Sequence, residues 1–146
     1  MASKPVSDAV VARLATELAQ FTAIPLSDYS VAPRPPNDVD EFICARFIGT
    51  YRERAEIGGD PPEDCAVFED GTFRIDVYVR INPKSASGQT LETRMQTVRE
   101  TVIAAFINHA FDGVEIFSAS TGLDLPAGAP PGWWADSIGF GFHFEH

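Results

Sequence analysis

The residue types best suited to chemistry are a serine and three histidines in the last third of the chain. The stretch 135–139 (ADSIG) has alanine in place of the first glycine of a Gly-x-Ser-x-Gly motif, and it opens a strand instead of joining a strand to a helix. The nearest base, His143, lies about 20 Å from Ser137 along an extended strand. His109, His143 and His146 are not spaced to share a metal ion with a carboxylate. We therefore expect no catalytic residues and no metal site.

Two glycine-containing stretches are incomplete versions of phosphate-binding motifs. Residues 139–141 (GFG) lack the third glycine and the following helix of a dinucleotide-binding fingerprint. Residues 85–89 (SASGQ) lack the lysine and hydroxyl that end a P-loop. Glycines on the polar side of a terminal strand more commonly allow another backbone to approach closely. We expect no cofactor.

The two cysteines do not form a recognisable site. Cys44 and Cys65 are 21 positions apart, with no Cys-x-x-Cys and no paired histidine, so a zinc site would lack ligands. No signal peptide is apparent, and two reduced thiols in a cytosolic compartment are the expectation. A disulfide between them is the alternative.

Acidic residues are concentrated in one part of the chain, where eight of the 21 lie between Glu53 and Asp76. The segment 58–64 (GGDPPED) is typical of a solvated acidic loop. A general acid–base pair needs a rigid, buried setting that such a loop lacks. Since no other group of catalytic side chains can be recognised in the sequence, we expect that the protein is not an enzyme.

Composition favours one folded domain spanning residues 1–146. The chain has 146 residues, 45% hydrophobic, with 11 Lys+Arg against 21 Asp+Glu and a formal charge of −10. It is large enough to bury roughly two thirds of its surface. No apolar run approaches the roughly 20 residues of a membrane helix. The negative charge disfavours nonspecific binding to nucleic-acid phosphates.

Arginine and aromatic side chains form the one pattern that suggests binding. In a chain that is otherwise acidic, they recur on the polar side of the two long strands, and protein interfaces are enriched in both types. A solvated sheet face is the alternative. Two tryptophans lie in a Pro/Gly-rich loop. We expect one of them to join the core, and the other is a candidate anchor for a partner protein. The candidate interface residues are Arg46, Arg52, Arg74, Tyr78, Arg80, Trp133 and Trp134.

The first half of the chain predicts a helix followed by two strands. Ser7 can cap a helix that ends before Pro25, and the proline-rich segment 27–40 is extended. A long strand over 42–57 precedes the acidic loop. Turn chemistry at 69–71 (EDG) leads into a strand over 72–81 in which apolar and polar residues alternate strictly.

The second half predicts another helix and two more strands. Apolar residues at helical spacing start at Leu91, and Asp112-Gly113 ends the helix. A strand follows over 114–121, and Trp133-Trp134 lead into a last strand over 137–145. We therefore expect an α+β fold: a mainly antiparallel four-stranded sheet with a long helix packed on one face and an N-terminal helix.

This order of elements resembles the tail terminator proteins of long-tailed bacteriophages and of phage-derived gene transfer agents. The resemblance covers about Ser7 to Phe144 and is carried by element order and by one strand pattern, E-x-G-x-F-x-I-x-V-x-V. That pattern is formed here by Glu69, Gly71, Phe73, Ile75, Val77 and Val79.

The resemblance implies a structural virion protein at the head-proximal end of the tail, made in the host cytoplasm. Such proteins form a hexameric ring that caps the tail tube, stops its growth and joins it to a neck or head-completion protein. DNA passes through the ring without specific binding. An Arg/Tyr-bearing sheet face would suit the acidic loop of a neighbouring subunit.

Two other classes remain open. One is another head–tail connector or neck protein, although those more often are helical bundles or small β-barrels. The other is a small-molecule-binding α+β domain or a small enzyme, which would be a monomer or dimer with a closed apolar pocket.

Overall fold

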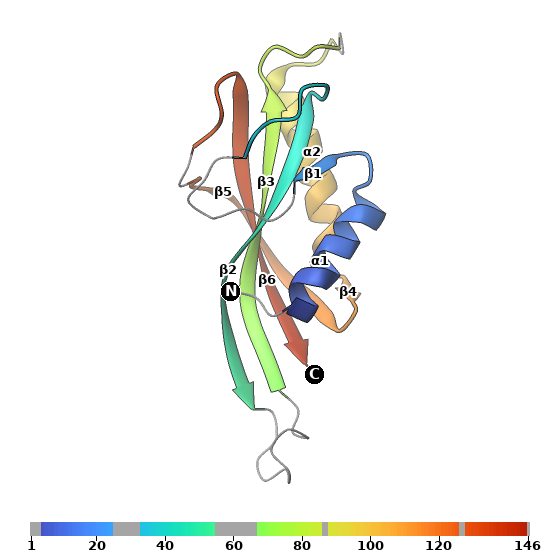
Figure 1. Cartoon of the computed structure of the whole chain (residues 1–146), viewed down its shortest axis with the longest axis vertical. Coiled ribbons are helices and arrows are strands. Elements are labelled where there is room, and N and C mark those ends of the chain that lie inside the picture. Colours follow the sequence, from blue (N-terminus) through green and yellow to red (C-terminus); the bar gives the residue numbers. More distant parts are fainter. Residues whose placement is uncertain (1–3, 25–32, 55–66, 86–87, 126–127, 146) are drawn as a thin grey trace.

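The computed structural model describes residues 4–24, 33–54, 67–85, 88–125 and 128–145, with the side chains of 48–54 and 67 not described. Within these ranges the chain forms α1 (Lys4–Glu17), β1 (Thr22–Ile24), β2 (Glu41–Arg54), β3 (Val67–Arg80), α2 (Leu91–Phe106), β4 (Ala110–Phe111), β5 (Val114–Leu123) and β6 (Trp133–Glu145) (Figure 1).

The strands form one six-stranded sheet in the order β1-β2-β3-β6-β5-β4. β1 runs parallel to β2, and the other neighbouring strands are antiparallel. The long strands twist strongly about one another (Figure 1). β3 pairs with β2 along one side and with β6 along the other, so it forms the centre of the sheet.

The predicted four-stranded antiparallel sheet was wrong, because the sheet is six-stranded and mixed. The broad α+β class is compatible with the structure. The two strands missed by the sequence analysis are β1, with three residues, and β4, with two. Alternation cannot be recognised in strands that short, and their pairing depends on distant partners.

α1 and α2 both lie on one face of the sheet (Figure 1), which we call the helix face. The alternating residues of β3 point into this core, as predicted: Phe73, Ile75, Val77 and Val79 are all fully buried. Ile138, Phe140 and Phe142 of β6 join them. Ile81 was predicted to continue the same side but is 46% exposed, because β3 ends at Arg80.

The helix ends differ from those predicted. α1 begins at Lys4, and Ser7 lies inside it, where its hydroxyl donates to the carbonyl of Lys4. Thr90 caps α2 by accepting from the backbone N–H of Thr93. α2 ends at Phe106, before the predicted stop at residues 112–113. Both of those residues have positive φ, 48° and 81°, and form the tight turn between β4 and β5.

The predicted start of the strand over 72–81 was also wrong. Residues 69–71 were expected to turn, but they lie within β3 and pair with both β2 and β6. Pairing on both sides overrides local turn preference. The ladder between β2 and β3 shifts register between Phe47 and Gly49, which interrupts the regular alternation of side chains along β2. The predicted acidic loop 58–64 lies outside the described residues.

Candidate assembly surface

The sheet face opposite the helices, which we call the opposite face, carries most of the predicted interface residues. Arg46 lies here, but it is only 2% exposed. Its Nε is 2.6 Å from Oδ2 of Asp76, itself 2% exposed. The hydroxyl of Ser137 donates to the other oxygen, Oδ1 of Asp76, at 2.7 Å. These three side chains form a buried polar cluster across β2, β3 and β6.

Electrostatics in this cluster favour a structural role. Burial raises the pKa of Asp76 above its ordinary value, although the hydrogen bond from Ser137 and the charge of Arg46 oppose the shift. Ser137 is fully buried and already donates to a carboxylate, so it does not present a nucleophile to solvent. The structure therefore leaves no serine-hydrolase arrangement at residues 135–139.

An aromatic cluster adjoins these polar groups. The rings of Phe42 and Tyr78 stack with centroids 4.4 Å apart, and Trp133 meets Phe42 edge-on at 4.9 Å. Tyr78 is fully buried and Trp133 is 6% exposed. Burial, together with the charge of Asp76, raises the pKa of Tyr78 to about 12. Tyr78 and Trp133 thus belong to a second core on the opposite face and lie below the surface of the described part of the chain.

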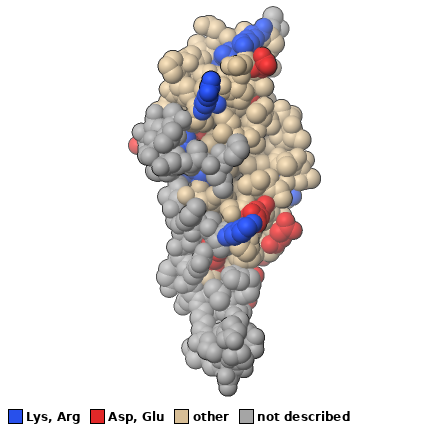
Figure 2. All heavy atoms as spheres, viewed as in Figure 1, with Lys and Arg blue, Asp and Glu red and all other residues tan. Residues whose placement is uncertain are grey.

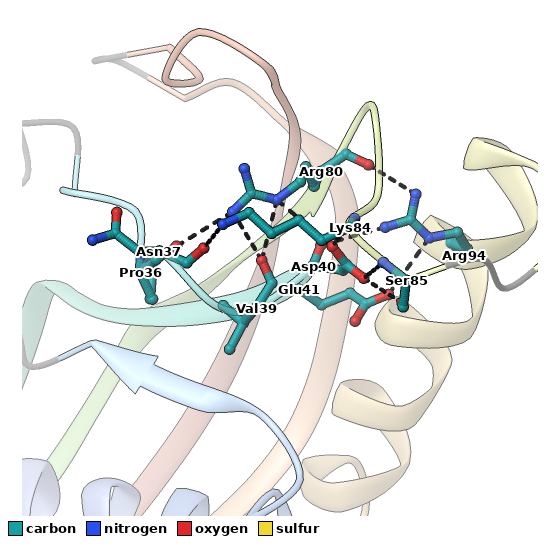
Figure 3. A network of polar contacts seen from close by, with 9 residues as sticks. All are labelled: Pro36, Asn37, Val39, Asp40, Glu41, Arg80, Lys84, Ser85 and Arg94. Atoms are coloured by element: carbon teal, nitrogen blue, oxygen red, sulfur yellow. Dashed lines mark hydrogen bonds and ion pairs between the residues drawn. The ribbon is translucent and has the colours of Figure 1, made fainter.

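Arg80 is held by the segment that precedes β2. Its Nε and Nη2 donate to the carbonyl of Val39 at 3.2 and 3.0 Å, and Nη2 also donates to the carbonyl of Pro36 at 3.4 Å (Figure 3). Its guanidinium lies 4.4 Å from the ring centroid of Trp133, a cation–π contact. The guanidinium therefore fastens residues 36–39 over the aromatic cluster.

Asp40 is the centre of the same network (Figure 3). Its carboxylate accepts from the backbone N–H of Lys84 at 2.7 Å and from the hydroxyl of Ser85 at 2.5 Å. The Ser85 hydrogen bond is the main reason that the pKa of Asp40 lies below its ordinary value of 3.8. Arg94 of α2 is 4% exposed and donates to the carbonyl of Arg80 at 2.8 Å. Its Nε lies 3.5 Å from a carboxylate oxygen of Glu41.

The sequence analysis missed Asp40 and Arg94. The available signal was weak: an acidic residue directly before a strand, and an arginine within the apolar stripe of a helix. Asp40 and Arg94 belong to one network only because the segment before β2, residues 84–85 and α2 lie side by side in the fold.

Arg74 borders a surface groove of about 300 Å³ on the opposite face. Its Nη1 donates to the carbonyl of Asp124 at 2.6 Å. Gly139 and Gly141 lie in the groove, which Thr72, Ser118, Ser120, Leu123 and Phe140 also line. A Cβ at Gly139 would lie 2.7 Å from Leu123, and one at Gly141 would lie 2.5 Å from the hydroxyl of Ser118. These glycines therefore allow close approach, as the sequence suggested, but the approach is by side chains of β5.

The most exposed large apolar side chain among the described residues is Phe117, at 61%. It follows Ile116, where the ladder between β5 and β6 shifts register. Its ring lies 3.0 Å from the position that a Cβ of Gly141 would occupy. Phe117 therefore lies on the opposite face, as alternation with the buried Val114 and Ile116 requires. The sequence analysis did not single out this residue, although its alternation with the apolar Val114 and Ile116 was an available signal.

The remaining predicted residues are separate from this surface. Trp134 is 38% exposed on the helix face, in a hollow of about 520 Å³ beside Thr90, Leu91 and Glu92 at the start of α2. Arg52 lies in β2, in register with Glu69, and its side chain is not described. The predicted set is thus divided between a buried core, the groove at Arg74 and the start of α2.

The histidines that were considered for chemistry make local contacts. His143 Nδ1 lies 2.5 Å from a carboxylate oxygen of Asp70, and its ring is 5.2 Å from that of Phe68. His109 Nε2 lies 3.2 Å from the carbonyl of Ala104. Across the described ranges, no three His, Cys, Asp or Glu side chains are grouped so that they could hold a metal ion.

The chain matches no protein-family model, and a search of curated proteins finds no match. None of the helices in the described part of the chain is long and apolar enough to cross a membrane.

Proposed function

We propose that this chain is a tail terminator subunit that assembles into a six-membered ring, caps the tail tube, stops its growth and joins it to the neck. The observation that carries the proposal is the one-sided covering of the sheet. α1 and α2 lie on one face (Figure 1), whereas the opposite face carries the exposed ring of Phe117. An exposed aromatic on a sheet face suits contact with another protein.

The use of the polar side chains also supports a structural role. Arg46, Asp76 and Ser137 are buried and bind one another. Arg80 binds carbonyl groups of its own chain. Buried, mutually satisfied groups of this kind favour one rigid conformation, which a ring subunit needs.

Charge supports the proposed passage of DNA through the ring. Each subunit has a formal charge of −10, so a ring has a strongly negative total charge. On the face in Figure 2, basic and acidic side chains lie in small, scattered groups. A face without a large basic patch lacks the phosphate-binding contribution that would slow DNA. The proposed partners are other copies of the chain, the tail tube protein and the neck protein.

Solution mass tests the proposal directly. A ring of six 15.9 kDa subunits has a mass of about 95 kDa, and negative-stain images of the same sample should show a central hole. Light scattering over a concentration series measures the mass. A species of 15.9 kDa at every concentration would contradict the ring. Stabilisation of that monomer by a small ligand would instead favour a binding domain.

A second measurement tests the terminator role itself. Purified tube protein should form shorter tubes when the ring is present, because capped tips no longer add subunits. Tube lengths in electron micrographs give the readout. If the ring forms fully but the tube lengths do not change, the protein assembles into a ring without terminating tubes, and the terminator role is contradicted.

A further inference from the structure

We draw no further inference here: the strongest candidate, the groove between Arg74 and the exposed ring of Phe117 on the opposite face of the sheet, carries nothing because nothing in the described part of the structure shows what covers it.

Discussion

At the scale of single residues, the buried pair of Arg46 and Asp76 shows how burial changes the role of a charged side chain. An arginine on the polar parity of a strand is ordinarily solvated, but Arg46 is 2% exposed and lies 2.6 Å from its carboxylate partner. The desolvation of two charges makes such a pair costly to break and weak as a net source of stability.

This pair leads to a prediction about unfolding. Arg46→Met leaves Asp76 charged and buried, and it should lower the free energy of unfolding by about 3–5 kcal/mol. Adding Asp76→Leu removes the stranded charge and should restore most of the loss. Urea unfolding of the single and double variants measures both values. A single variant that loses less than about 1 kcal/mol would show that the carboxylate stays satisfied without its arginine.

At the scale of elements, the network around Asp40 holds three segments together. It joins the segment before β2 to residues 84–85 after β3, and Arg94 extends it to α2 (Figure 3). Side chains of Asp40 and Arg94 thus bind backbone groups at the end of β3 and just after it. The pattern of side chains in the sequence carries no information about such contacts.

The lowered pKa of Asp40 gives this network a pH dependence. Because the folded-state pKa is below the ordinary 3.8, the ionised carboxylate stabilises the fold above that pH, and the stabilisation is lost as pH falls through the folded value. Asp40→Asn should therefore lower stability at neutral pH and make the decline below about pH 4 shallower. Urea midpoints at several pH values measure the effect.

Asp38→Asn is the matched control, since Asp38 is an exposed carboxylate two residues away. This substitution should change neither the stability at neutral pH nor the decline of stability below about pH 4. Equal effects of the two substitutions would assign the pH dependence to general charge and not to the network.

At the scale of the whole molecule, the sheet has a long centre and short margins. β3 pairs on both sides from Phe68 to Val79, whereas β1 and β4 contribute three and two residues. Local opening needs least free energy where few contacts must break. The sheet should therefore open from its margins.

Hydrogen exchange followed by mass spectrometry or NMR tests this order. We expect the slowest amides in the middle of β3 and the fastest strand amides in β4 and β1. Uniform protection across all strands would mean that the sheet opens only by global unfolding.

The alternating core of β3 and β6 could be predicted from the residue pattern alone. Phe73, Ile75 and Val77 recur with period two, and side chains of a strand must point to opposite faces. The same rule identified Ile138, Phe140 and Phe142, and all six are fully buried. Strong periodicity over a long segment survives in almost any packing, so it could be read without knowing the partners.

Whether the residues that alternate with this core are buried or exposed depends on tertiary contacts. Tyr78 is buried because Val39 and other apolar side chains from distant segments pack against its aromatic cluster. Arg46 is buried beside Asp76, whereas Phe117 on the same face of the sheet is exposed. The short strands β1 and β4 likewise exist through their pairing partners. These features depend on contacts between distant segments, and local residue preference carries no information about which segments will meet.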